Sequence, residues 1–293
     1  MYKSIEPYLK SNNRFIIVCV DIESFEFLKK IKNKKLEIIF SREFENLKIL
    51  KIKKERKIDE YCWTLKPVAT EFILKYIKDC KWVAYMDSDI MVFNSIDNYL
   101  DDSFDVILTP HRPSNDYFLQ EIQKAGIFNA GFVAFKKSAN GFKALKWWKK
   151  KCLDKCCNIA SDDDYADQKY LNQLSLIFKN INTDPDEGLN VAPWNIANNS
   201  EYLNLKKKKI IFFHMQAFRI FNINFFDAYS GNFKISKNTL QNIYYPYIKI
   251  LKKSYEELKL IDSKFEQKKE FKISLIHILK RFLKKKNNYL LVK

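Results

Sequence analysis

Short apolar runs rich in β-branched residues alternate with amphipathic segments along the first part of the chain. The runs "RFIIVCV", "LEIIF", "WVAYM" and "FDVILT" begin at residues 14, 36, 82 and 104. Between them, residues 22–35 and 67–80 place apolar side chains at helical spacing, and Pro67 is expected in a first helical turn, where its missing N–H does no harm. This alternation predicts an α/β fold with a mixed, mostly parallel sheet flanked by helices.

Acidic residues follow several of these predicted strands. Asp21 ends the first run, and Asp87 and Asp89 follow "WVAYM". Ligands of such sheets bind at the carboxyl ends of the strands. Two carboxylates one residue apart repel each other unless a hard cation lies between them, so the "DSD" triplet suits a divalent metal. The same triplet also forms good turns and helix caps, so taken alone it leaves both interpretations open.

The remaining pattern predicts further elements and a division of the chain. "GIFNAGFVAF" at 126–135 indicates a strand with small residues at its start, and residues 141–156 and 164–178 indicate helices. "KIIFFH" predicts a late strand that ends on His214. After about Asn232 the pattern is helical and rich in lysine. We therefore expect a domain over 1–232 and a basic helical extension over 233–293.

The net charge of the chain indicates which classes of binding partner to expect. The formal net charge is +17 and comes mostly from lysine, which favours anionic partners such as a membrane surface or a phosphorylated substrate. A nucleic-acid-binding protein is the alternative outside the enzymes, but arginine is scarce and no recognisable module occurs, so we expect no nucleic acid. With no leader pattern and no long apolar run, a cytoplasmic protein is expected.

Five segments occur in an order that resembles a known superfamily. They are "YMDSDIMVF", "FNAGFVAF", "ADQKYLN", "NVAPWNI" and "IFFHMQAF". Together they resemble the GT-A glycosyltransferases, and within them the nucleotide-diphospho-sugar transferases related to glycogenin and the bacterial lipopolysaccharide galactosyltransferases. The chain also resembles uncharacterised bacterial glycosyltransferase-like proteins that carry "KP", "TPHR", "DQKYL" and "APWN". The resemblance runs from about residue 14 to 222.

The resemblance implies a metal site and a donor site. Asp87 would contact the donor ribose or the metal, Asp89 would ligate the metal, and His214 would complete the site. A histidine beside carboxylates suits Mn²⁺, which we expect to be preferred over Mg²⁺. Asp167 and Gln168 match a catalytic pair beside the transferred sugar. The residues expected to bind the donor are Asp21, Asp87, Asn129, Ala130, Gly131 and Arg219.

The chain departs from the related galactosyltransferases after the late histidine. Ala217 stands where they have glycine, and Ile220 stands where they have a lysine that meets the diphosphate. Arg219, one position earlier, is expected to supply that charge. His111-Arg112 is a second candidate anion clamp, and Trp194 could stack on a sugar or belong to the core.

The expected activity is transfer of a sugar from a nucleotide-diphosphate sugar, with UDP as the expected nucleotide, to a glycan or lipid-linked acceptor. A nucleotidyltransferase on a similar sheet is the alternative enzyme, but "VCVDIESFEF" lacks the glycine-rich phosphate loop that it usually has. Neither the sugar nor the anomeric outcome follows from the sequence.

The lysine-rich tail carries an apolar stripe at helical spacing. An apolar stripe beside basic residues is typical of a helix that lies in a membrane interface, although such a stripe also packs on a protein core. We expect the tail to meet an anionic membrane surface, and a chain that ends near Ser263 to stay folded. The stripe consists of Phe271, Leu275, Ile278, Leu279 and Phe282.

Overall fold

The computed structural model describes residues 1–161, 164–196, 209–263, 265, 280–281, 283 and 287–292. The strands are β1 (Phe15–Cys19), β2 (Leu36–Phe40), β3 (Trp82–Met86), β4 (Ile90–Val92), β5 (Val106–Pro110), β6 (Phe128–Lys136), β7 (Ile181–Asn182), β8 (Phe212–His214), β9 (Arg219–Asn222), β10 (Phe225–Asp227) and β11 (Tyr289–Leu291). The α-helices are α1 (Tyr2–Ile5), α2 (Ile22–Leu28), α3 (Leu47–Glu55), α4 (Ile58–Tyr76), α5 (Asp116–Ala125), α6 (Ala139–Asp154), α7 (Tyr170–Ile177), α8 (Pro193–Ile196), α10 (Lys237–Thr239) and α11 (Tyr245–Ile261).

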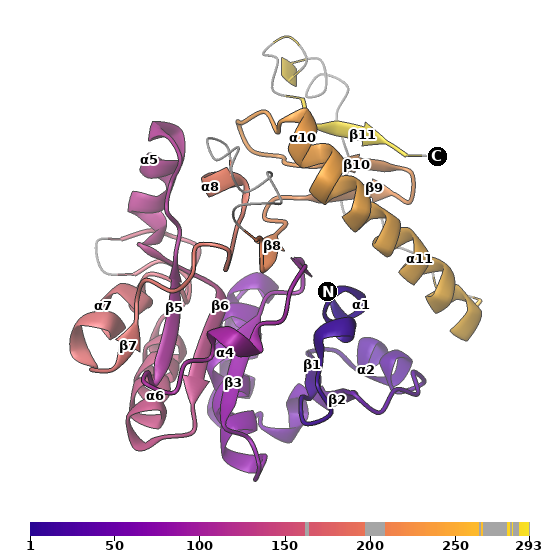
Figure 1. The fold of residues 1–293 in the computed structure, drawn as a ribbon. Coiled ribbons are helices and arrows are strands. Elements are labelled where there is room, and N and C mark those ends of the chain that lie inside the picture. The colour runs from indigo at the N-terminus through magenta and orange to yellow at the C-terminus, as the bar shows by residue number, and fades with distance from the viewer. Residues whose placement is uncertain are drawn as a thin grey trace.

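The central sheet has four strands in the order β3-β6-β5-β7 (Figure 1). β6 pairs antiparallel with both β3 and β5, and β5 pairs parallel with β7. Three of the four strands therefore run in one direction and β6 runs against them. β1 and β2 form a separate parallel pair. The mixed α/β fold expected from the sequence is confirmed, with β6 inserted between strands that the alternation alone would have made neighbours.

The reversed direction of β6 brings three chain segments to one edge of the sheet. Met86, the last residue of β3, lies opposite Phe132, and Thr109 near the end of β5 lies opposite Asn129. The carboxyl ends of β3 and β5 thus meet the amino end of β6. Polar residues that follow β3 and β5 or begin β6 are gathered at this edge.

Buried apolar side chains cover both faces of β6. Val133 and Phe135 pack with Leu145 and Trp148 of α6 in one hydrophobic cluster. Phe132 and Ala134, which alternate with them, pack with Phe212 of β8 in another. The sheet is therefore covered on both sides, which is why its central strand is apolar without alternation.

Two predicted helix boundaries are wrong. α4 begins at Ile58, so Pro67 lies inside the helix rather than in its first turn. Proline removes one helical hydrogen bond, but eight other residues of α4 besides Pro67 are buried, and this packing maintains the helix. α7 begins at Tyr170, so Asp167 and Gln168 precede the helix that was predicted from residue 164.

The chain after Asn232 is helical only in part. α10 and α11 occupy the predicted helical region, but Tyr289–Leu291 form β11, which pairs antiparallel with β10. The helical prediction is wrong for Tyr289–Leu291. Leu290 is buried and its two neighbours are more exposed, which is the alternation of a strand. Tyr244 and Ile248, which follow the predicted domain boundary at residue 232, share a buried cluster with Phe213 of β8, which precedes it. The boundary itself stays a prediction.

Buried polar contacts hold the end of the chain against β10. Arg281 donates to Asp227 Oδ2 over 2.8 Å and to the carbonyl oxygen of Tyr229 over 2.7 Å. Asn288 donates to the carbonyl oxygens of Tyr229 and Phe233. A chain ending near Ser263 would lose these contacts and β11, and the expectation that it stays folded stays a prediction. The five residues of the apolar stripe, Phe271, Leu275, Ile278, Leu279 and Phe282, lie outside the described residues.

Among the described residues, no helix has the length and apolar character that crossing a membrane requires.

Candidate active site

Asp87, Asp89 and His214 lie together at the edge of the sheet. His214 Nε2 is 3.2 Å from Asp89 Oδ1 and 3.8 Å from Asp87 Oδ2. One ligand atom from each of the three residues lies within 4.8 Å of the others. Two carboxylates and an imidazole nitrogen form a donor set suited to Mn²⁺ or a similar divalent metal. The three predicted metal ligands are thus brought together.

Short antiparallel pairing places the histidine beside the acids. β4 begins directly after Asp89, and its residue Ile90 lies opposite His214 in β8. The amide of Met215 donates to the carbonyl oxygen of Asp89 over 2.8 Å. Since Ile90 is fully buried, the strand that follows the acidic triplet is anchored in the core while the acids stay at the edge.

The opposite charges of His214 and Asp89 shift the pKa values of both groups. Burial alone would lower the pKa of His214, but the charge and the hydrogen bond of Asp89 outweigh burial and raise it. Burial alone would raise the pKa of Asp89, but His214 outweighs burial and lowers it. Each group favours the charged form of the other, as expected for an acid beside a buried histidine.

Gly131 leaves the space that His214 occupies. A Cβ at position 131 would lie 2.5 Å from His214 Cε1 and 2.6 Å from Asn129 Oδ1. The sequence predicts small residues here so that a donor sugar can approach, whereas the structure gives a more immediate reason for the glycine. The contact of Ala130 and Gly131 with a donor stays a prediction.

A buried lysine links the cluster to Asp167. Lys66 Nζ lies 3.0 Å from Asp87 Oδ1 and 3.3 Å from Asp167 Oδ2, and its side chain is only 8% exposed. The Tyr85 hydroxyl donates to the same Asp87 oxygen over 2.7 Å. Burial disfavours the charged lysine, but Asp167 and Asp87 outweigh burial and raise the pKa of Lys66 well above its usual value. Lys66 is therefore a permanent cation between two acids.

Asp167 reaches this position through a turn rather than a helix. Ala166 has a φ of 51°, in the left-handed region that a residue with a Cβ rarely adopts. Trp148 Nε1 donates to the carbonyl oxygen of Asp167 over 2.7 Å, and the Asp167 side chain is buried. Burial raises the pKa of Asp167 to about 6, partly opposed by Lys66. The predicted catalytic acid is thus an inward-facing side chain.

Gln168 and Asn129 belong to a second, neighbouring network. Gln168 Oε1 accepts from Asn129 Nδ2 over 2.9 Å and from the amide of Ala130 over 3.1 Å. Asn129 Oδ1 accepts from the Gly131 amide and from Asn190 Nδ2. These bonds fix the backbone of 129–131 beside His214. Direct contact of Gln168 or Asn129 with a substrate stays a prediction.

Two predicted donor-binding residues lie on other elements. Asp21 caps the N-terminus of α2 by accepting from the Ser24 amide over 2.7 Å. Arg219 begins β9 and lies opposite Asp227 of β10. Ala217, two residues earlier, has a φ of 62°, in the left-handed region that favours glycine. The roles of Asp21 and Arg219 toward a donor stay predictions.

The predicted anion clamp and stacking residue have structural roles. His111 is buried, and burial lowers its pKa to about 4, so it is neutral at pH 7, and its role toward an anion stays a prediction. Arg112 donates to Asp184 and to the carbonyl oxygen of Pro185. Trp194 is 5% exposed and packs edge-on against His214 with ring centroids 5.5 Å apart. Trp194 therefore supports the histidine from within the core.

Sequence reasoning gave no role to Lys66, Tyr85 or Asn190. Lys66 belongs to the "KP" dipeptide that is part of the resemblance. A lysine in a predicted first helical turn is, however, expected to be exposed to solvent. Asn190 adopts a φ of 61° and donates to Asn129 and Thr109. Only the fold brings residues so distant in sequence into these contacts.

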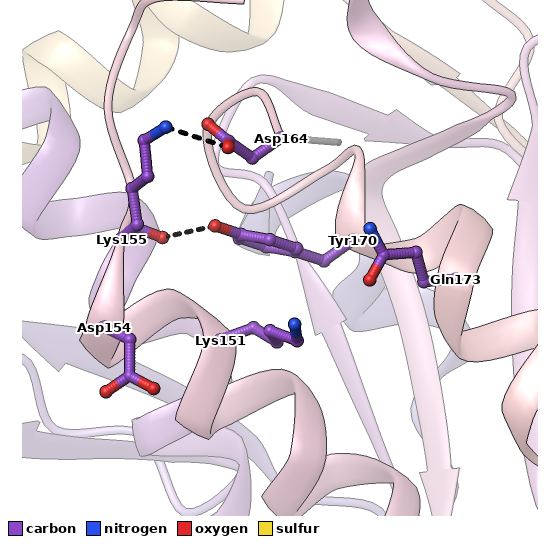
Figure 2. A pocket seen from close by; sticks show the side chains of 6 residues that line it. All are labelled: Lys151, Asp154, Lys155, Asp164, Tyr170 and Gln173. Carbon is purple, nitrogen blue, oxygen red and sulfur yellow. Dashed lines mark hydrogen bonds and ion pairs between the residues drawn. The ribbon is translucent and has the colours of Figure 1, made fainter. Parts of the chain in front are cut away.

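A surface cavity is lined by residues from the end of α6, by Asp164 and by residues of α7 (Figure 2). Its volume is about 540 Å³. Lys155 Nζ lies 2.9 Å from Asp164 Oδ2, and the Tyr170 hydroxyl donates to the carbonyl oxygen of Lys155 over 2.9 Å. The metal-ligand cluster is not part of its lining, which consists of Lys151, Asp154, Lys155, Asp164, Tyr170 and Gln173.

Comparisons with known proteins give relatives without an established function and solved structures at low identity. No family model matches the chain. The uncharacterised protein YfnF of Bacillus subtilis (strain 168) is 29% identical over 241 residues, which are 76% of this chain and 78% of YfnF. YfnD of the same organism is 28% identical over 253 residues, 83% of this chain and 80% of YfnD.

Two solved structures similar to this chain are glycosyltransferases. The galactosyltransferase LgtC with donor and acceptor sugar analogs is 18% identical, covers 86% of this chain and 89% of its own, and has a TM-score of 0.45. A glycosyltransferase that takes part in glycosylation of the major capsid of PBCV-1 is 13% identical, covers 69% and 93%, and has a TM-score of 0.42. Both likenesses are distant.

Proposed function

We propose that this protein is a metal-dependent glycosyltransferase of the GT-A type. It would transfer a sugar from a nucleotide-diphosphate sugar, with UDP as the nucleotide, to a glycan or lipid-linked acceptor. The observation that carries the proposal is the convergence of Asp87, Asp89 and His214 within 4.8 Å at the carboxyl edge of the sheet. The five ordered segments of the resemblance contribute the residues of this cluster and of its surroundings.

The residues fit a divalent cation. His214 Nε2 faces both carboxylates, and two acids so close together repel each other unless a positive charge lies between them. A cation held there supplies Lewis-acid stabilisation of the charge that develops on a leaving nucleoside diphosphate. Imidazole and carboxylate ligands support Mn²⁺ over Mg²⁺, since Mg²⁺ prefers oxygen ligands and bound water.

The remaining polar residues orient this site. Lys66 holds Asp87 on one side and Asp167 on the other, so the position of each acid depends on the same ammonium group. Gln168 holds the backbone of Ala130, and Gly131 leaves room for His214. In our proposal Asp167 lies nearest the transferred sugar and Gln168 positions the 129–131 segment.

A screen of nucleotide-sugars tests the proposal. Purified protein is incubated with UDP-, GDP- and CDP-sugars, with Mn²⁺ or with a chelator, and the release of nucleoside diphosphate is measured. The proposal predicts slow metal-dependent hydrolysis of one class of donor, with UDP-sugars preferred. Pyrophosphate release from a nucleoside triphosphate and a sugar phosphate, with no donor hydrolysis, would instead identify a nucleotidyltransferase.

A further inference from the structure

Three large aliphatic side chains project from one part of the surface. Leu47 begins α3 and is 86% exposed, Ile58 begins α4 and is 68% exposed, and Ile159 follows α6 and is 74% exposed. Exposing an aliphatic side chain to water costs free energy, and single examples are common on protein surfaces. The grouping of these three with basic residues needs a separate explanation.

Contacts with the end of α6 hold the three segments together. Lys48, next to Leu47, lies 3.2 Å from Asp154. Arg56, two residues before Ile58, donates to the carbonyl oxygen of Leu153 over 3.0 Å. Glu60 accepts from the amide of Asn158 over 3.0 Å, directly before Ile159. We call residues 47–60 and 150–161 the basic rim.

The basic rim carries an excess of positive charge. It contains nine lysine and arginine residues against four acids. Two of these acids, Glu55 and Asp154, already pair with lysines of the rim. Lys51, Lys54 and Lys57 are exposed. A surface that combines protruding aliphatic side chains with lysines matches an anionic bilayer, which takes the aliphatic groups below its headgroups and attracts the cations.

The basic rim lies on the same side of the molecule as the candidate site. Lys66 of α4 lies beside Asp87, which follows the last residue of β3. After Lys66, the C-terminal half of α4 leads to the loop before the amino end of β3. The eight residues 58–65 come before Lys66, so they extend past the carboxyl end of β3. At 1.5 Å per residue, Ile58 lies about 12 Å beyond Lys66 along the axis.

We infer that the basic rim docks this protein onto an anionic phospholipid bilayer, with Leu47, Ile58 and Ile159 inserted at the interface. Docking in this orientation turns the edge of the sheet that holds the metal ligands toward the bilayer. If the proposed transferase function holds, an acceptor carried on a lipid is then presented to the site. The docking itself does not depend on that function, because it is measured without turnover.

Co-sedimentation with vesicles tests the inference. The full chain is mixed with vesicles of phosphatidylcholine alone, or of phosphatidylcholine and phosphatidylglycerol in equal parts. We expect sedimentation only with the anionic vesicles, and weakening at high salt because exposed charges are screened. Failure of the full chain to sediment with anionic vesicles would overturn the inference.

Matched triple variants locate the docking surface. Replacing Leu47, Ile58 and Ile159 with serine should abolish sedimentation, whereas serine at Leu176, Ile177 and Leu260, which are also exposed, should leave it unchanged. Replacing Lys51, Lys54 and Lys57 with glutamine should weaken vesicle affinity on the order of a hundredfold. Glutamine at Lys75, near the C-terminal end of α4, and at Lys78 and Lys81, which follow that end, removes the same charge and should have a much smaller effect.

The contrary results are equally specific. If both rim variants sediment as the unmodified chain does, another surface, such as the lysine-rich tail, binds the bilayer and the inference is wrong. If the control triplets lose as much affinity as the rim triplets, binding follows net charge or general apolar exposure rather than this surface. Thermal unfolding of each variant shows that the comparison is made between folded proteins.

Discussion

Gly131 and His214 are packed so closely that a methyl group on one would displace the other. A Cβ at position 131 would lie 2.5 Å from His214 Cε1, well inside normal contact. Trp194 also packs edge-on against the imidazole, with the ring centroids 5.5 Å apart. The geometry of the proposed metal site therefore depends on a residue that has no side chain.

Gly131→Ala should weaken Mn²⁺ binding by displacing His214. Loss of support around a metal ligand commonly costs about 10–100-fold in affinity. Calorimetric titration of Mn²⁺ into the variant measures this. The matched comparison is Gly131→Ala in a chain that already carries His214→Ala, where the additional loss should be small. An equal loss in both backgrounds would show that Gly131 acts elsewhere.

Lys66→Met should destabilise the fold because it leaves Asp87 and Asp167 facing each other without a cation. Removing one partner of a buried ion pair costs about 3 kcal/mol or more. Lys48→Met is the control, since Lys48 pairs with Asp154 at the surface, where the two side chains are 59% and 51% exposed and such a pair is worth about 1 kcal/mol or less. Urea unfolding measures both. Equal effects of the two substitutions would contradict the assigned role of Lys66.

His111 should make stability depend on pH between about 4 and about 6.5. Its pKa is about 4 in the folded protein, against an ordinary value of 6.5. In this window the unfolded chain binds a proton that the folded protein does not, so stability falls as the pH drops, by up to about 3 kcal/mol. His111 is satisfied when neutral, with Nδ1 against the carbonyl oxygen of Ile127 and Nε2 accepting from Asn129.

His111→Gln isolates this contribution because glutamine can make both contacts and does not titrate. The difference in unfolding free energy between about pH 7 and about pH 5 should be smaller in the variant. An unchanged difference would mean that His111 does not stay neutral in the folded protein.

Arg281→Met should destabilise the protein because Asp227 would lose a buried cation. The Asp227 side chain is 2% exposed, so the cost is expected to be about 3 kcal/mol or more in urea unfolding. Asp227→Asn with Arg281→Met should recover part of it, since the unpaired charge is then removed. Lys30→Met, which breaks an exposed pair with Asp262, should cost little. A negligible effect of Arg281→Met on the unfolding free energy would contradict the conclusion that this residue holds the end of the chain against the core.

The strands and the acidic cluster could be predicted because each depends on a local pattern. The apolar runs before Asp21 and Asp87 form β1 and β3, and the acids follow them at the sheet edge. The joining of Asp87, Asp89 and His214 also agrees with the resemblance, which supplied the histidine.

The errors arose where the fold overrides local preference. Pro67 suggested a helix start, but burial of α4 on both sides of it maintains the helix. Asp167 was expected on a helix, because the sequence pattern does not reveal the left-handed conformation of Ala166. The pairing of β11 with β10 joins residues more than 60 positions apart, a distance that periodicity does not describe. The role of Lys66 does not follow from the sequence because its two acidic partners come from distant parts of the chain.

Titration of Mn²⁺ and UDP into the Asp89→Ala variant tests the central claim most directly. Asp89 Oδ1 lies 3.2 Å from His214 Nε2, so its removal deprives the proposed site of one of three ligands. The unmodified chain should bind Mn²⁺ and UDP together and hydrolyse a UDP-sugar in a metal-dependent manner. Asp89→Ala should lose the metal-dependent binding and slow the hydrolysis roughly a thousandfold or more while remaining folded. Metal binding and donor hydrolysis close to those of the unmodified chain in this variant would contradict the proposed metal site.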